Sequence, residues 1–295
     1  MENISVPYVA FSQQVAKIKN ELMCAVESVL ESGQYVLSEK GTQFEKEFSE
    51  YCEAKFSIGV ANGTDALHLV LRCLDVGPGD EVITAPNSFI ASAGAIGVLG
   101  AKPVFVDICP DLNLDPALLE KAITSKTKAI MPVHLTGRPA KMKQIIEIAD
   151  HHKLSVVEDA AQAVGAKIAG KRVGGIGDAS CFSLHPLKNL NVWGDGGVIV
   201  TRSEELAEKL KQSRESGKPL PDAHSRSYLC SRRSMTAATS APSCAPRRHS
   251  ASARRTSSSV PSGSRDLCRS RCEKRRPGLA RLARTTMIMA FQRMR

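Results

Sequence analysis

Hydrophobic positions in the first 217 residues follow two spacings, one typical of helices and one typical of strands. Apolar residues three and four apart predict helices, and short continuous apolar runs predict strands from position 56 onward. The predicted helices cover 12–30, 42–52, 65–74, 88–100, 116–123 and 141–153, and another opens at position 203. The predicted strands cover 56–61, 81–86, 102–108, 128–135, 154–160, 178–186 and 196–201.

The regular alternation of strand and helix after position 56 predicts an α/β fold. Strands separated by helices of this length form a mostly parallel sheet that is covered by helices on both faces. Ligands of such sheets bind beyond the carboxyl ends of the strands. The residues that directly follow each strand are therefore the first candidates for function.

The formal net charge of +10 conceals two regions of opposite charge. Residues 1–217 have 22 basic and 27 acidic residues, whereas residues 218–295 have 18 basic and 3 acidic residues. The tail is rich in Arg, Ser, Pro and Ala and shows no helical or strand period, and such a composition does not offset the entropy of folding. We expect a folded domain over 1–217 and a tail over 218–295 that is disordered or out of frame.

Three interpretations of the tail compete. It is a disordered Arg-rich arm that binds nucleic acid, a solvated linker, or the product of a shifted reading frame that replaces a genuine C-terminal half. The abrupt change from Lys to Arg inside a helical pattern favours the shifted frame. The tail has no helix-turn-helix pattern, zinc spacing or interleaved aromatic residues, which weighs against a nucleic-acid partner.

The lack of a recognisable targeting signal and the pattern of cysteines predict a cytoplasmic protein without a membrane partner. No apolar run approaches the roughly 18 residues of a membrane span, and the N-terminus has no basic stretch before an apolar run. The nine cysteines are an odd number without framework spacing, as expected for thiols in a reducing compartment. No Cys/His set has zinc spacing, so no metal site is expected.

The motif Asn62-Gly63-Thr64-Asp65 joins a predicted strand to a predicted helix. Glycine lets the backbone approach a ligand, and the first N–H groups of the helix bind anions. Ser183, near the end of a later strand, offers a hydroxyl donor for a phosphate. The alternatives are an ordinary helix cap at position 62 and a satisfied strand hydroxyl at Ser183.

Glu158 and Asp159 end the most apolar strand, where a carboxylate needs a cationic partner or several donors. Either a protonated cofactor ring or a protein cation meets this need. Gln162 would share a face with them if a helical turn begins there. Lys188 lies in a loop bounded by a His-Pro pair and a Gly-rich run, and its alternative is an ordinary surface lysine.

Phe89 could stack on a flat ring or pack in the core, and His134 could line a cleft or be a core histidine. An anion-binding helix start, an aromatic residue, a buried acid and a loop lysine follow successive strands in this order. Pyridoxal 5'-phosphate requires this set of groups.

Residues 7–217 resemble the DegT/DnrJ/EryC1/StrS family of sugar aminotransferases. The resemblance implies the aspartate-aminotransferase type of fold, fold type I of the pyridoxal-phosphate enzymes, with a homodimer. It rests on ANGTDALHLVL, GPGDEVITAPNSFIASAGAI, GAKPVFVDI, KTKAIMPVHLTG, VVEDAAQAVGA, GDASCFSLHPLKNL and GDGGVIVT.

The same resemblance implies a ping-pong transfer of an amino group, usually from glutamate, to a keto group of a nucleotide-linked sugar. Such reactions serve cell-surface polysaccharide or deoxyamino-sugar biosynthesis. The implied roles are the internal aldimine and proton shuttle for Lys188, the pyridine-nitrogen partner for Asp159, a bond to the phenolic oxygen for Gln162, phosphate binding for Gly63, Thr64 and Ser183, and ring stacking for Phe89.

Residues 218–295 depart from the family pattern. A full-length relative continues there into a smaller domain, which contacts the sugar nucleotide and supplies an asparagine to the neighbouring subunit's phosphate. We therefore expect this chain to be inactive or nearly so. Two other functions stay open, a regulator or nucleic-acid binder and a pyridoxal-phosphate dehydratase or isomerase. Lys188 argues against the dehydratases, which have His there.

Overall fold

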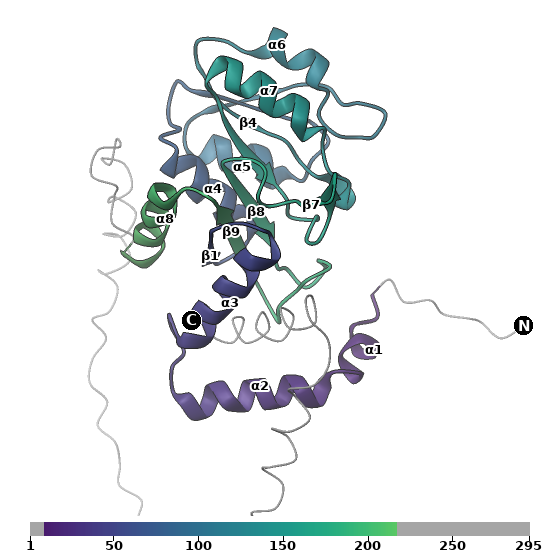
Figure 1. The fold of residues 1–295 in the computed structure, drawn as a ribbon, viewed down its shortest axis with the longest axis vertical. Coiled ribbons are helices and arrows are strands. Elements are labelled where there is room, and N and C mark those ends of the chain that lie inside the picture. The colour runs from purple at the N-terminus through teal and green to yellow at the C-terminus, as the bar shows by residue number, and fades with distance from the viewer. Residues whose placement is uncertain (1–8, 217–295) are drawn as a thin grey trace, which may run out of the picture. The chain divides into compact units, whose positions relative to one another are not determined.

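The computed structural model describes residues 9–216, and the expected tail region 218–295 lies outside the described residues. Seven strands form one sheet in the order β1-β9-β8-β5-β4-β2-β3. Figure 1 labels β1, β9, β8 and β4 of this sheet among the surrounding helices. All of its neighbouring strands are parallel except where β9 pairs antiparallel with β1 and β8. The strands are β1 (Phe56–Val60), β2 (Glu81–Thr84), β3 (Lys102–Phe105), β4 (Thr127–Met131), β5 (Ser155–Asp159), β8 (Ala179–Ser183) and β9 (Gly197–Thr201).

The helices agree with the predicted ones in order, and the α/β class is confirmed. The predicted helix over 12–30 is two helices, because Ile18 leaves the helical region with φ −123° and ψ 6°. A short hairpin of β6 (Lys167–Ile168) and β7 (Lys171–Arg172) was not expected. The helices are α1 (Phe11–Ala16), α2 (Lys19–Ser32), α3 (Glu39–Tyr51), α4 (Gly63–Cys73), α5 (Ile90–Val98), η1 (Pro116–Leu118), α6 (Leu119–Ala122), η2 (Leu135–Gly137), α7 (Met142–His152) and α8 (Glu204–Ser216).

Side-chain caps fix where several helices begin. The Ser38 hydroxyl accepts a hydrogen bond from the Gly41 N–H, so α3 begins earlier than predicted. Asp115 caps η1 by accepting from the Ala117 N–H at 3.1 Å, with proline at the first helical position. This cap was predicted from the sequence and is confirmed.

Helices cover both faces of the sheet. On one face, α3 packs Phe44 and Phe48 against Phe182 of β8, and α6 and α7 cover β4 and β5. On the other face, α4 packs on β8 and β9 and also contacts α5 and α8. Because side chains alternate along a strand, consecutive residues of β5 point to different helical layers.

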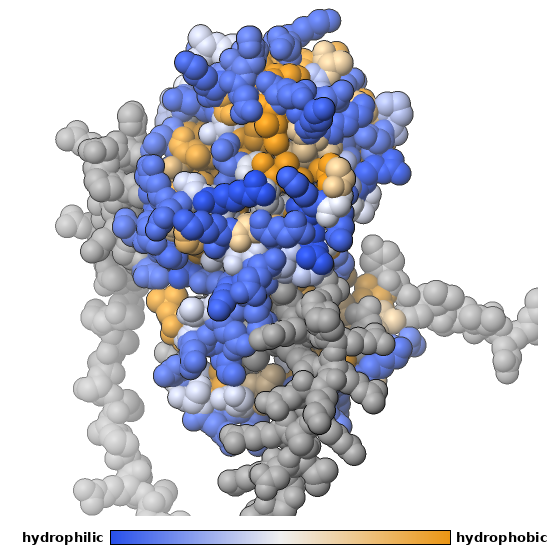
Figure 2. All heavy atoms as spheres, in the orientation of Figure 1, coloured by the Kyte–Doolittle hydropathy of each residue, from blue (hydrophilic) through white to orange (hydrophobic). Residues whose placement is uncertain are grey.

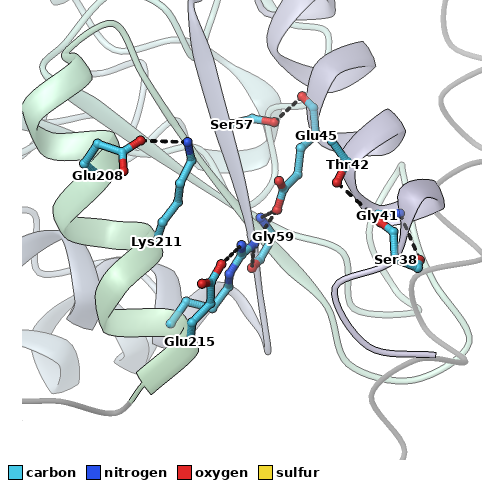
Figure 3. A network of polar contacts seen from close by, with 10 residues as sticks. Ser38, Gly41, Thr42, Glu45, Ser57, Gly59, Glu208, Lys211 and Glu215 are labelled. Carbon is cyan, nitrogen blue, oxygen red and sulfur yellow. Dashed lines mark hydrogen bonds and ion pairs between the residues drawn. The ribbon is translucent and has the colours of Figure 1, made fainter. Parts of the chain in front are cut away.

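A network of polar contacts holds the edge strand β1 between α3 and α8 (Figure 3). The Glu45 carboxylate of α3 accepts the Gly59 N–H at 2.8 Å and pairs with the Arg214 guanidinium of α8. Arg214 also pairs with Glu215 at 2.9 Å. Ser57 of β1 donates its hydroxyl to the Glu45 carbonyl. These contacts fix the strand that leads into α4.

The view in Figure 2 shows a largely hydrophilic surface with separate apolar patches. Among the helices that the structure describes, none combines the length and apolarity needed to cross a membrane. Cys52, Cys73, Cys109 and Cys181 are free and buried.

Candidate active site

The predicted site residues lie after three strands that point the same way. Strands β5 and β8 are parallel, and β1 has the same direction as β8 because both are antiparallel to β9. The carboxyl ends of all three strands therefore meet at one edge of the sheet. Asp159 ends β5, Ser183 ends β8, and α4 begins at Gly63 shortly after β1.

The start of α4 lies directly against the end of β8. A Cβ atom at Gly63 would lie 2.8 Å from the Cβ of Ser183, and a Cβ at Gly197 would lie 2.4 Å from the Asn62 carbonyl carbon. Only glycine fits such close backbone approaches. The structure thus brings together Gly63 and Ser183, two of the residues predicted to bind phosphate.

The first turn of α4 offers donors to an anion. Asn62 is extended and accepts the Asp65 N–H through its side chain at 2.8 Å. The N–H groups of Gly63 and Thr64 lie between Asn62 and the capped N–H of Asp65, and first-turn N–H groups have no partner within the helix. The Ser183 oxygen accepts the His185 N–H at 3.3 Å, which leaves the hydroxyl proton available for donation. Three donors therefore lie around this helix start.

Asp159 is a buried carboxylate with few donors. Its backbone is held to the segment that follows β4, where its N–H donates to the Pro132 carbonyl and its carbonyl accepts from the His134 N–H. Its side chain accepts the Ser92 hydroxyl at 2.7 Å and the Ala161 N–H at 3.2 Å. Burial raises the pKa of Asp159, and these donors, together with His134 and Lys188, lower it only in part. A cationic partner would favour its charged form.

Glu158, the preceding residue, is a structural acid. It is completely buried and accepts hydrogen bonds from Ser180 at 2.5 Å, His134 at 2.9 Å, and the N–H groups of Gly177 and Ile176. Burial alone would raise the pKa of Glu158, but the bonds from His134, Ser180 and Gly177 outweigh it, and the pKa lies below its usual range. Of the two acids that end β5, only the Asp159 carboxylate has too few donors among the described residues to offset its burial.

His134 is a satisfied core histidine and does not line a cleft. Its side chain is fully buried. The Ala140 N–H donates to Nδ1 at 3.0 Å, so the proton of the neutral ring lies on Nε2, which faces Glu158. Both ring nitrogens thus have partners in the protein.

Lys188 lies in the loop between β8 and β9, which is anchored to the core on both sides. The Lys188 N–H donates to the His185 carbonyl at 2.8 Å, and its own carbonyl accepts from the Asn191 side chain at 3.1 Å. Leu190 and Val192 are buried in the core under β8. Lys188 is half-buried, and its charge lowers the pKa of Asp159, so the two side chains share one electrostatic environment.

Gln162 and Phe89 flank this region on the surface. Gln162 lies in a turn, where the sequence suggested the start of a helical turn, and its Oε1 accepts the Thr136 N–H at 2.8 Å. This leaves the amide N–H2 group as a donor. Phe89 is the N-cap of α5 and is 72% exposed, so it is not a core residue. It lies one turn before Ser92, the donor to Asp159.

Ser92 is the site residue that sequence reasoning missed. It is a single hydroxyl in a predicted helix of small and apolar residues, 67 positions before its acceptor. The only signal was Ser88, four residues earlier and thus on the same helical face. The two hydroxyl oxygens lie 2.7 Å apart.

A cavity of about 600 Å³ lies elsewhere, at the β1 edge of the sheet. Val60, Asp65, His68 and Arg214 are among its lining residues, and none of the predicted site residues is. The predicted site at the carboxyl edge of the described sheet is therefore separate from this cavity.

Comparison with known proteins places most of the chain in one family. A sequence model of the DegT/DnrJ/EryC1/StrS aminotransferase family matches residues 16–241, and so extends past position 217, the last residue of the resemblance expected from the motifs. A pleiotropic regulatory protein of Geobacillus stearothermophilus is 48% identical over 215 residues, 72% of this chain and 58% of that protein. A dTDP-3-amino-3,4,6-trideoxy-alpha-D-glucose transaminase of Streptomyces venezuelae is 46% identical over 217 residues, 73% of this chain and 57% of that protein. The chain spans less than two thirds of these relatives.

A solved structure supports the same assignment. NtdA from Bacillus subtilis, solved with bound cofactor PMP, matches with a TM-score of 0.66 at 37% sequence identity. The match covers 72% of this chain and 49% of NtdA. The expected aspartate-aminotransferase type of fold, fold type I, is therefore confirmed for the matched region.

Proposed function

Because the chain belongs to the DegT/DnrJ/EryC1/StrS aminotransferase family, we propose that its described domain binds pyridoxal 5'-phosphate for amino-group transfer to a nucleotide-linked keto sugar. The observation that carries this proposal is the convergence of complementary groups at one sheet edge. A helix N-terminus beside a serine hydroxyl fits a phosphate. The buried Asp159 carboxylate, whose donors do not offset its burial, fits a protonated ring nitrogen.

The predicted residues divide into groups with different tasks in this proposal. Gly63, Thr64 and Ser183 hold the phosphate, and Asp159 holds the proton of the ring nitrogen. The Lys188 amine is the covalent attachment point. Two surface side chains complete the set: the Gln162 amide donates to the phenolic oxygen and Phe89 covers the ring.

The cofactor, when bound, supplies an electron-accepting ring that stabilises negative charge on the carbon next to the transferred nitrogen. Lys188, once free, would move a proton from that carbon to the cofactor carbon that bears the nitrogen, and would carry it the other way in the second half of the transfer. Asp159 favours the protonated form of the ring nitrogen. The Asp159 carboxylate is buried, and beside a neutral ring it would have no counter-charge there. The amino donor becomes a keto acid, and the keto sugar becomes an amino sugar.

Glutamate is the proposed amino donor, and a homodimer the proposed assembly. Phe89 and Ile90, at the start of α5, are 72% and 74% exposed, and Leu187 beside the lysine is also exposed. An apolar surface of this kind around a site favours coverage by another polypeptide. A second copy of the chain is consistent with the family's dimeric sites.

We further propose that the 295-residue chain transfers little or no amine. The match spans 58% and 57% of two of its relatives, and residues 218–295 are rich in Arg, Ser, Pro and Ala, a composition for which we favour a shifted reading frame. Sequencing the gene around codons 212–220 tests the shifted frame, which requires another frame that encodes a folded continuation. Rapid glutamate-dependent amination by the purified chain would contradict the proposed inactivity.

The cofactor site is tested by reductive trapping. The purified chain is incubated with pyridoxal 5'-phosphate, reduced with a hydride and digested for peptide mapping. We expect the label on Lys188, no label in Lys188→Ala, and full labelling in the control Lys171→Ala, which changes an exposed lysine of β7. A folded preparation without label on Lys188 would overturn the proposed site.

The two other functions make different predictions. A regulator that binds DNA through residues 218–295 would show strongly salt-dependent binding that is lost on deletion of the tail. A dehydratase or isomerase would give a sugar product without new nitrogen. A sugar product that has gained nitrogen from the donor would exclude the dehydratase and isomerase.

A further inference from the structure

Two hydroxyl groups in series approach Asp159, one from Ser92 of α5 and one from Ser88, which directly precedes the N-cap of that helix. The Ser92 oxygen lies 2.7 Å from Asp159 Oδ2, and the Ser88 oxygen lies 2.7 Å from that of Ser92. Ser92 is 1% exposed and Asp159 is 5% exposed. The contact therefore lies inside the protein, between a helix and the end of a central strand.

The direction of the two hydrogen bonds follows from the single proton that each serine hydroxyl can donate. A hydroxyl has one proton, and the Ser92 proton goes to the carboxylate. Ser88 must then donate its own proton to the Ser92 oxygen. Donation in one direction strengthens each bond in the series, because each donor is polarised by the one behind it.

We infer that Ser92 is a positioning residue for Asp159, which fixes the carboxylate and sustains its charged form toward the cofactor ring, with Ser88 as its supporting donor. The inference rests on the proposed cofactor function. Ser92 holds one carboxylate oxygen and the Ala161 N–H holds the other. Each oxygen retains a lone pair, so a ring N–H can be accepted without breaking either bond.

Several titratable groups act on Asp159 besides the two serines. His134 follows β4, Lys188 follows β8, and Cys181 lies on β8 next to β5. His134 accepts the Ala140 N–H at its Nδ1 and faces Glu158 through Nε2, so it makes no hydrogen bond to the Asp159 carboxylate. Ser92 is thus the one donor side chain on Asp159 among the residues that the structure describes.

Removal of the Ser92 hydroxyl makes the charged form of Asp159 less favourable. Burial already raises the pKa of this acid, and the Ser92 bond opposes the rise. In Ser92→Ala the pKa of Asp159 is higher, so a larger fraction is protonated at a given pH. A protonated acid does not pair with a cationic ring, and cofactor binding weakens first at low pH.

The experiment measures binding of pyridoxal 5'-phosphate to the full chain across pH 5–9, by visible absorption. We expect the acid limb of the binding profile to move to higher pH by about one unit in Ser92→Ala. Ser88→Ala should shift it in the same direction by less, and Ser92→Thr, which keeps the hydroxyl, should restore the wild-type profile.

Ser180→Ala is the matched control. It also removes a buried hydroxyl from a carboxylate of β5, but that carboxylate is Glu158 on the opposite face. A shift in Ser180→Ala equal to that in Ser92→Ala, or a Ser92→Ala profile identical to wild type, would overturn the inference. If Ser92→Ala does not fold, Ser88→Ala decides: a wild-type profile in that variant overturns the inference.

The proposed function and this inference fail in distinguishable ways. A folded wild-type chain that binds no cofactor at any pH would overturn both. A wild-type chain labelled at Lys188 whose binding profile is insensitive to Ser92 and Ser88 would overturn the inference alone.

Discussion

Glu158 and Asp159 are consecutive carboxylates of β5, and two different layers of the molecule surround them. On the face covered by α3 and α7, Glu158 receives hydrogen bonds from His134, Ser180 and two backbone N–H groups. On the face of α4 and α5, Asp159 receives two from the part of the chain that the structure describes. Both acids are buried, so burial does not distinguish them. The number of donors identifies which acid completes the core and which awaits a ligand.

The protonation of the two acids reflects the same difference. Donors around Glu158 more than compensate its burial and lower its pKa, whereas burial outweighs the donors around Asp159 and raises its pKa. The core face is thus complete without a ligand, and the opposite face leaves a carboxylate whose charge a cation would stabilise.

Asp159→Asn should produce the largest effect, and it should be on binding. The amide has the size of the acid and can still accept the Ser92 hydroxyl, but it has no charge to pair with a ring N–H. We expect the dissociation constant of pyridoxal 5'-phosphate at pH 7 to rise about 10- to 100-fold, as measured by absorption titration.

The same variant should not destabilise the cofactor-free chain. Replacing a buried carboxylate that lacks a counter-charge by a neutral amide removes a cost of burial. Urea denaturation should therefore give an unchanged or higher free energy of unfolding. A large loss of stability with unaltered binding would assign Asp159 to the core and remove its distinction from Glu158.

Glu158→Gln should show the reverse pattern. The amide presents an N–H2 group to neighbours that all donate, and His134 cannot change its tautomer because the Ala140 N–H occupies Nδ1. We expect the free energy of unfolding to fall by about 1–3 kcal/mol, measured by urea denaturation.

Cofactor binding to folded Glu158→Gln should stay close to wild type, since Glu158 points away from the site. Glu147→Gln, which changes an exposed acid of α7, is the control and should leave stability within about 0.5 kcal/mol. Weaker binding in Glu158→Gln than in Asp159→Asn would reverse the assignment of the two faces.

The sequence predicted the elements better than it predicted the contacts between them. The order of strands and helices, the Asp115 cap and the carboxyl-edge position of Gly63, Asp159 and Lys188 all follow from local pattern and chain direction. The break near Ile18 did not, since the apolar spacing continues through it. The alternation of a strand puts Glu158 and Asp159 on opposite faces, but only tertiary packing supplies His134 to one and Ser92 to the other.

The pH dependence of stability is the smallest and most discriminating effect, because the two acids should contribute with opposite sign. The lowered pKa of Glu158 gives a stabilisation that is present above about pH 4.3, its unfolded value, and is lost as pH falls through the folded pKa. The raised pKa of Asp159 gives the cofactor-free chain a stabilisation that is full below about pH 3.9 and is lost as pH rises through the folded pKa.

Urea denaturation of the cofactor-free chain between pH 3 and pH 8 separates these two contributions. The deficit of Glu158→Gln relative to wild type should shrink as the pH falls, and the advantage of Asp159→Asn should grow as the pH rises. Each difference changes by about 1.4 kcal/mol for every unit by which the folded pKa departs from the unfolded one. Stability differences from wild type that stay constant with pH in both variants would show that the faces do not treat the two carboxylates differently, because linkage requires a slope wherever the folded and unfolded pKa values differ.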